Sequence, residues 1–108
     1  MRNFKELKIW QKGLDIVVKA YKLTGYFPKE EKYGITSQIT RASVSIPSNI
    51  AEGSSRSSEK DYNRFIEISL GSSFELETQL LISQALSFGE NNLTAEILKD
   101  TLMKNKKC

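Results

Sequence analysis

The side chains that most often perform catalysis are scarce in this sequence and poorly spaced for it. The 108-residue chain has no histidine, so the commonest general base and most transition-metal ligand sets are missing. Glu75 and Glu77 stand two residues apart, which separates them by about 200° on a helix and prevents them from acting as a facing pair. No serine has a matched base in view. We therefore expect no enzymatic activity and no catalytic residues.

The sequence also lacks complete motifs for binding metal ions or phosphate groups. The Glu-x-x-His pattern of di-iron bundles cannot occur without histidine. The segment Gly53-Ser54-Ser55-Arg56 lacks the Gly-Lys-Ser/Thr ending of a phosphate-binding loop. A magnesium site built from carboxylates alone stays formally open. We expect neither a metal nor a cofactor.

Lysines offer a different chemistry, the binding of phosphate groups. The net charge is +3, but both ends of the chain are basic and the middle is acidic. Five lysines share one side of a predicted first helix, with Asp15 interrupting them: Lys5, Lys8, Lys12, Lys19 and Lys22. This pattern indicates either a solvated helix face or a strip that binds RNA or DNA, with contacts that add up in an oligomer.

Helical periodicity defines the elements that must position these residues. Apolar residues recur at spacings of three and four, and no segment shows the period-two pattern of a strand. Gly25 should end the first helix in a left-handed conformation, Pro47 should kink the second without breaking it, and Ser58 with Asp61 should cap the third. The expected helices cover residues 4–24, 34–53 and 58–88, closed by Gly89, and a short fourth helix from 91. Short loops predict an all-α, antiparallel up-down-up-down four-helix bundle in one domain, residues 1–108.

The first helix has two apolar rows. The row expected to face the core contains Leu7, Trp10, Leu14, Val17 and Tyr21. Ile9, Ile16 and Leu23 recur every seven residues and lie about 150° from Trp10 on a helical wheel. They are either scattered exposed residues or, as the strict period favours, an interface with another copy of the chain.

The second and third helices should form a hairpin about residues 54–58. This pairing places Ala42 opposite Gly71, where two small residues would let the helices approach closely. It also brings polar residues of the two helices together, and interhelical pairing is favoured over a ligand site for them. The expected polar network consists of Arg41, Ser45, Asn49, Glu52, Ser72 and Glu75.

Compartment is indicated by what the sequence lacks. Cys108 is the single cysteine, so no intrachain disulfide can form. The longest uncharged stretch, residues 78–89, is well short of the roughly 20 residues needed to span a bilayer. No apolar signal-peptide core is present. We expect a cytoplasmic protein with no membrane association.

One long motif resembles a known family. The run from Arg41 to Gly53, Arg-Ala-Ser-Val-Ser-Ile-Pro-Ser-Asn-Ile-Ala-Glu-Gly, is similar to the signature of the bacterial "four helix bundle proteins". Some members are encoded in intervening sequences of the 23S ribosomal RNA gene. Supporting pieces lie in order around the motif, within residues 4–89: Leu7-x-x-Trp10-Gln11, Phe27-Pro28-x-x-Glu31-x-x-Gly34, Gln38, Arg56, Phe65, Gly71-Ser72 and 75–80.

The resemblance implies a closed homopentamer of antiparallel bundles. It also implies kinship with the accessory variability protein of diversity-generating retroelements, a basic pentamer that binds nucleic acid and a reverse transcriptase. Thr40 stands where the family usually has a second arginine, and the fourth helix should be short, ending in the lysine-rich residues 104–108. We expect a non-enzymatic homo-oligomer that binds structured RNA or DNA; the alternative is an oligomeric scaffold for a protein partner.

Overall fold

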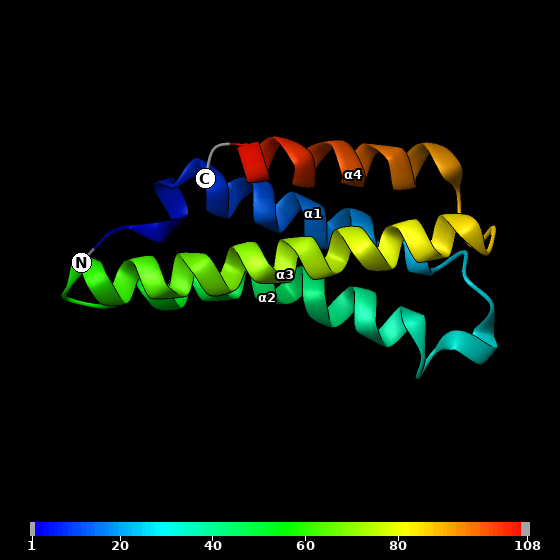
Figure 1. Ribbon diagram of the computed structural model, residues 1–108, viewed down its shortest axis with the longest axis horizontal. Coiled ribbons are helices and arrows are strands. Elements are labelled where there is room, and N and C mark those ends of the chain that lie inside the picture. The colour runs from blue at the N-terminus through cyan, green and yellow to red at the C-terminus, as the bar shows by residue number, and fades with distance from the viewer. Residues whose placement is uncertain (1, 107–108) are drawn as a thin grey trace.

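The computed structural model describes the backbone of residues 2–106 and the side chains of residues 2–101. Four α-helices and two short 3-10 helices make up this part of the chain, which contains no strand (Figure 1). Cys108 lies outside it. The elements are η1 (Phe4–Glu6), α1 (Lys8–Thr24), η2 (Lys29–Glu31), α2 (Ile35–Ser54), α3 (Glu59–Ala85) and α4 (Asn91–Lys106).

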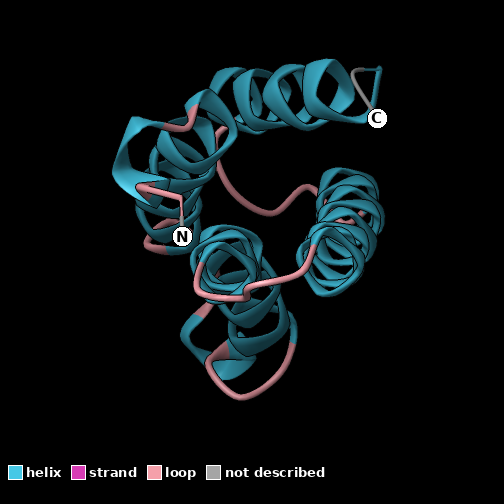
Figure 2. Ribbon diagram, turned by 90° about the vertical axis from the view of Figure 1, so that its left-hand side faces the viewer, coloured by secondary structure: helices cyan, strands magenta, loops and turns pink. Residues whose placement is uncertain are grey.

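The four α-helices form an up-down-up-down bundle, as the sequence predicted. Each helix runs antiparallel to the one before it, and α4 returns to pack against both α3 and α1 (Figures 1 and 2). The most extensive packing joins α2 to α3. The expectation of a short fourth helix is wrong, because α4 has 16 residues and is nearly as long as the 17-residue α1.

Local sequence signals account for most of the helix ends. Ser58 caps α3, where its hydroxyl accepts a hydrogen bond of 3.1 Å from the backbone N–H of Asp61. α2 continues through Pro47, whose ring is buried against Gly13 of α1. α1 ends before Gly25, but that glycine has φ −62° and not the expected left-handed conformation. The left-handed residues are Ser87, with φ 60°, and Gly89, with φ 83°, in the α3–α4 connection.

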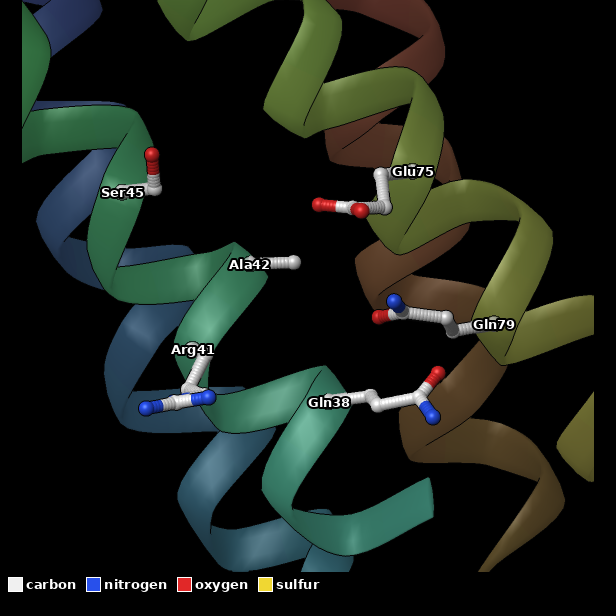
Figure 3. Close-up of a pocket in the computed structure, with 6 residues that line it drawn as sticks. All are labelled: Gln38, Arg41, Ala42, Ser45, Glu75 and Gln79. Atoms are coloured by element: carbon white, nitrogen blue, oxygen red, sulfur yellow. The ribbon is translucent and has the colours of Figure 1, made fainter. Parts of the chain in front are cut away.

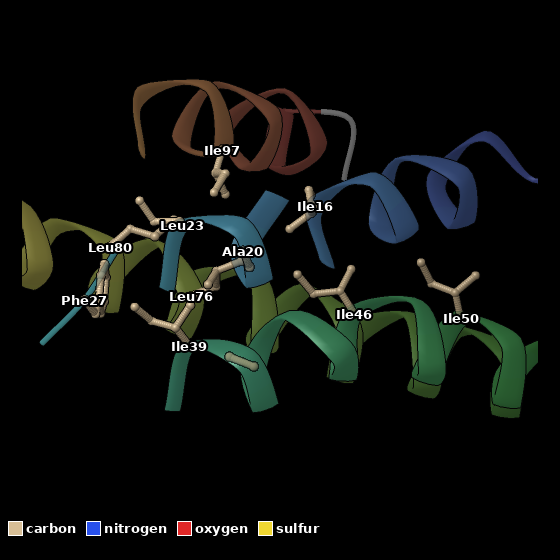
Figure 4. Packing of buried hydrophobic residues seen from close by; sticks show 11 residues of the cluster. Ile16, Ala20, Leu23, Phe27, Ile39, Ile46, Ile50, Leu76, Leu80 and Ile97 are labelled. Atoms are coloured by element: carbon tan, nitrogen blue, oxygen red, sulfur yellow. The ribbon is translucent and has the colours of Figure 1, made fainter. Parts of the chain in front are cut away.

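The core lies along the axis of the bundle and draws on all four helices (Figure 4). Its buried apolar residues are Ile16, Ala20, Leu23, Phe27, Ile39, Ala42, Ile46, Ile50, Leu76, Leu80 and Ile97. Hydroxyl side chains separate these residues, and several bond to a backbone carbonyl of their own helix. Ser54 Oγ donates to the Ile50 carbonyl at 2.9 Å, and Ser83 Oγ to the Gln79 carbonyl at 3.0 Å.

Most of the assignment of the two apolar rows of α1 was wrong, although Leu7 and Trp10 of the predicted core row do pack against the core. Ile16 and Leu23 are fully buried in the core of the same chain, and Ile9 packs against it. Ile16 and Leu23 therefore cannot form an interface with another folded copy, whereas Ile9 stays partly accessible. Leu14 and Tyr21, predicted to face the core, are 46% and 55% exposed. Gly13 and Ala20 share the buried face with Ile16, so α1 turns its smallest residues inward.

The pairing of α2 with α3 is displaced by about one turn from the predicted register. Ser45 Oγ lies 2.8 Å from Ser72 Oγ, and Ser69 Oγ donates to the Ile46 carbonyl at 2.9 Å. Gly71 is exposed, and a Cβ added to it would have no neighbour within 4 Å, so it does not meet Ala42. The close approach occurs instead at Gly53, where a Cβ would lie 2.8 Å from Phe65 Cβ.

Candidate functional site

The lysine strip predicted on the first helix is only partly available to a ligand. Lys5, Lys8 and Lys22 are exposed and Lys12 is half-buried. Among the described residues, no carboxylate lies within 4.0 Å of these four ammonium groups. Asp15 and Asp100 line the same shallow depression as Lys8 and Lys12, which lowers the positive potential there.

Lys19 belongs to an ion cluster between α1 and α4. Its Nζ lies 2.9 Å from Glu96 Oε1, 3.0 Å from Asp15 Oδ2 and 3.1 Å from Asp100 Oδ2. The hydrogen bond to Glu96, with those to Asp15 and Asp100, raises the pKa of Lys19 above its usual value, although partial burial opposes the shift. The prediction that Lys19 binds phosphate therefore loses its support, because three carboxylates already surround its charge. The two α4 carboxylates were not linked to Lys19 from the sequence, since they are distant along the chain.

We expect Lys19→Met to lower the free energy of unfolding by about 1 kcal/mol in low salt, because it leaves three carboxylates without their cation. A raised pKa in the folded state stabilises the fold below the unfolded pKa, near 10.5, and the gain is lost as pH rises through the higher folded pKa. The free energies of unfolding of the two proteins, measured by urea titration, should therefore differ from pH 7 to 10 and converge above that range. An equal difference at pH 12 would contradict this role for Lys19.

A continuous apolar face lies where α1 and α2 meet at the surface. We call it the α1–α2 face and define it as Trp10, Leu14, Val17, Tyr21 and Val44. Leu14, Tyr21 and Val44 are 46%, 55% and 39% exposed, and Trp10 and Val17 are half-buried. A groove of about 280 Å³ runs through it and is lined almost entirely by apolar atoms. Most of this face consists of the row that was expected to form the core.

The predicted polar network between α2 and α3 forms in part. Ser45 pairs with Ser72, and Asn49 Nδ2 donates at 2.8 Å to both the carbonyl and the hydroxyl of Ser45. Glu52 pairs with Arg56 at 2.8 Å, in the loop that follows α2, and not with α3.

The other two members of the predicted network stay apart. Arg41 and Glu75 have no hydrogen-bond or ion-pair partner for their side chains among the described residues. They line a pocket of about 430 Å³ between α2 and α3, together with Gln38, Ala42, Ser45 and Gln79 (Figure 3).

The described residues contain neither a cluster of side chains that could hold a metal ion nor a helix that could cross a membrane. No group of three or more acidic, cysteine or histidine side chains is gathered closely enough there to hold a metal ion. None of the described helices combines the length and apolarity that a membrane-crossing segment needs.

Comparisons with known proteins agree with this architecture. A family model described as "23S rRNA-intervening sequence protein" matches residues 5–106. A crystal structure of a protein of unknown function from the S23 ribosomal protein family of Bacteroides thetaiotaomicron superimposes with a TM-score of 0.82 at 25% sequence identity. That match covers 91% of this chain and 92% of the other. A search of curated proteins finds no significant match. The chain, matched by the family model over nearly its whole length, belongs to the 23S rRNA-intervening sequence protein family.

Proposed function

We propose that this protein is a non-catalytic homo-oligomer that assembles through the α1–α2 face. The observation that carries this proposal is the exposure of Leu14, Tyr21 and Val44. Leu14 and Val44 line the apolar groove, and Tyr21 lines an adjoining depression together with Val44. Contiguous apolar surface of this kind marks an interaction site, and tyrosine and tryptophan are enriched in such interfaces. Neighbouring helices, and not a mobile loop, hold the face in place. A closed pentamer is the proposed form, on the ground of the family resemblance.

Leu14→Glu is expected to convert the oligomer into a folded monomer, because it places a charge in the centre of the apolar face without touching the core. Light scattering after size exclusion should give the mass of several chains for the wild type and about 12.3 kDa for the variant. Ala95→Glu adds the same charge to an exposed position on α4 and should leave the mass unchanged. A wild-type monomer, or a Leu14→Glu protein of unchanged mass, would remove the support for assembly through this face.

A second candidate function is the binding of structured RNA or DNA by Lys5, Lys8, Lys12 and Lys22. It is favoured by the absence of a carboxylate within 4.0 Å of these four ammonium groups among the described residues. An oligomer would carry one copy of this lysine cluster on each chain, and the phosphate contacts of all copies would together raise the affinity. The alternative, a scaffold for a protein partner, is favoured by the acidic groups that adjoin the lysines.

The double variant Lys8→Glu/Lys12→Glu should bind nucleic acid more weakly, with a smaller dependence on salt. We expect the slope of log affinity against log salt to fall by about 0.9 for each lost phosphate contact on duplex DNA. Lys29→Glu/Lys32→Glu makes the same change in net charge beside η2 and serves as the control. If wild-type protein binds neither structured RNA nor duplex DNA at low salt, nucleic acid is removed as a ligand and the scaffold remains.

A further inference from the structure

The pocket between α2 and α3 gathers polar side chains that do not bond to one another. Gln38 projects from α2 toward α3, and Glu75 and Gln79 project from α3 toward α2 (Figure 3). No hydrogen bond joins these three side chains in the described part of the chain. Facing polar groups in a helix interface ordinarily pair with each other, as Ser45 and Ser72 do one turn away.

Gln79 is the most constrained member of this group. Its side chain belongs to a residue that is only 7% exposed, and its Oε1 is buried without a hydrogen-bond partner in the described structure. A buried acceptor that stays unpaired costs free energy, so native proteins retain few of them. A leucine at this position would pack without that cost. Because Gln79 also lines the pocket, its geometry suits a hydrogen-bond donor that enters from outside the chain.

The charged residues on the two sides of the pocket indicate what kind of molecule would carry that donor. Glu75 on α3 has no cation partner, and Arg41 on α2 has no anion partner, among the described residues. An ammonium group between Glu75 and Gln79 would supply donors to both the carboxylate and Oε1. The exposed guanidinium of Arg41 points away from Glu75 and Gln79 (Figure 3), so a carboxylate on the same molecule would pair with it at the outer edge of the pocket, where a guanidinium suits bidentate binding.

We propose that this pocket binds a small zwitterion that carries an amino group and a carboxylate, the chemistry of a free amino acid. Its volume of about 430 Å³ fits a molecule of this size and falls within the range of small-molecule sites, about 300–1,000 Å³. This proposal does not depend on the α1–α2 face, because none of that face's five residues lines the pocket.

Isothermal titration calorimetry of the wild-type protein with each L-amino acid tests the proposal. For each amino acid that binds, its N-acetyl derivative removes the ammonium charge and its methyl ester removes the carboxylate. We expect either change to weaken binding at least tenfold. Glu75→Gln and Arg41→Gln should do the same, as should Gln79→Leu, which should fold with an unchanged or higher melting temperature. Glu67→Gln, an exposed position on α3 outside the pocket, is the matched control and should bind normally.

Three results would overturn the proposal. One is the absence of binding by any amino acid, which would leave solvent as the partner of Gln79. The second is equal binding of the methyl ester, or of the parent amino acid by Arg41→Gln, which would leave a simple cation site. The third is a changed oligomer mass in Glu75→Gln without any amino-acid binding, which would assign the pocket to a contact between copies.

Discussion

Replacing Ile16 with glutamate is expected to unfold the protein and not merely to dissociate the proposed oligomer. Ile16 is fully buried at the centre of the core, where it packs with residues from the other helices (Figure 4). The substitution removes a buried aliphatic group, which costs about 2–5 kcal/mol, and places a carboxylate in the apolar core. Domains of this size have a total stability of about 5–15 kcal/mol. Circular dichroism should show a loss of helix or a melting temperature close to ambient.

The comparison with Leu14→Glu makes this experiment decisive about the two faces of α1. The two variants lie two residues apart on the same helix and carry the same new charge, but Leu14 is 46% exposed. We expect a folded monomer from Leu14→Glu and an unfolded chain from Ile16→Glu. A milder Ile16→Val should fold and lose only about 0.5–1.5 kcal/mol. A folded Ile16→Glu monomer would show that the buried and exposed faces of α1 have been assigned the wrong way round.

Gly89→Ala should produce the second large effect. Gly89 has φ 83°, a conformation that costs other residues about 1–2 kcal/mol. An added Cβ would also lie 2.7 Å from Leu23 Cδ1 and 2.7 Å from Phe27 Cε1, and overpacking of this kind costs about 1–3 kcal/mol. Together these terms predict a loss of about 2–5 kcal/mol, measured by urea or thermal unfolding.

Gly71→Ala is the matched control for this prediction. Gly71 lies within α3, has no positive φ, and would direct its new Cβ into open space. Alanine is favoured over glycine in a helix interior by about 0.5–1 kcal/mol, so this variant should be slightly more stable than the wild type. If both variants lost the same stability, the close approach of Gly89 to Leu23 and Phe27 would not be the cause.

The sequence predicted the number and order of the helices because those depend on signals carried by neighbouring residues. The period of three and four locates a helix, and residues such as Ser58 with Asp61 mark its start through a local hydrogen bond. The fourth helix was underestimated, because the lysine-rich residues near its end lack an apolar pattern. Lysine is nevertheless a good helix former and is favoured near the negative end of the helix dipole.

The face of α1 could not be predicted because apolar residues occupy more than half of its circumference. Periodicity reports that a stripe exists but does not say which of two stripes is buried. The row with the largest side chains was assigned to the core, whereas the structure buries the row that contains Gly13 and Ala20. Gly13 lies against Ile46 and Pro47, where an added Cβ would come within 3.3 Å of both. That close approach of two helices is a property of the packed structure, and only the small size of Gly13 hints at it.

The sequence predicted only some of the residues that line the candidate pocket. From the sequence, Arg41 and Glu75 were predicted to lie near each other across the hairpin and to belong to a paired polar network. In the structure, both line the pocket, but their side chains do not pair. Gln38 and Gln79 were not singled out for the network, because glutamines at helix surfaces are common and their burial depends on the register. The register itself was displaced by about a turn, and the hairpin loop alone does not fix it.

The hydroxyl-rich interior has a consequence for the thermodynamics of unfolding. Among the described residues, eight of the buried side chains are serine or threonine, alongside eleven apolar ones. Exposing apolar surface to water raises the heat capacity, whereas exposing polar surface lowers it. Unfolding a single chain should therefore change the heat capacity by less than an aliphatic core of equal size would. Its stability curve is correspondingly flat, and the fold should lose less of its stability on cooling.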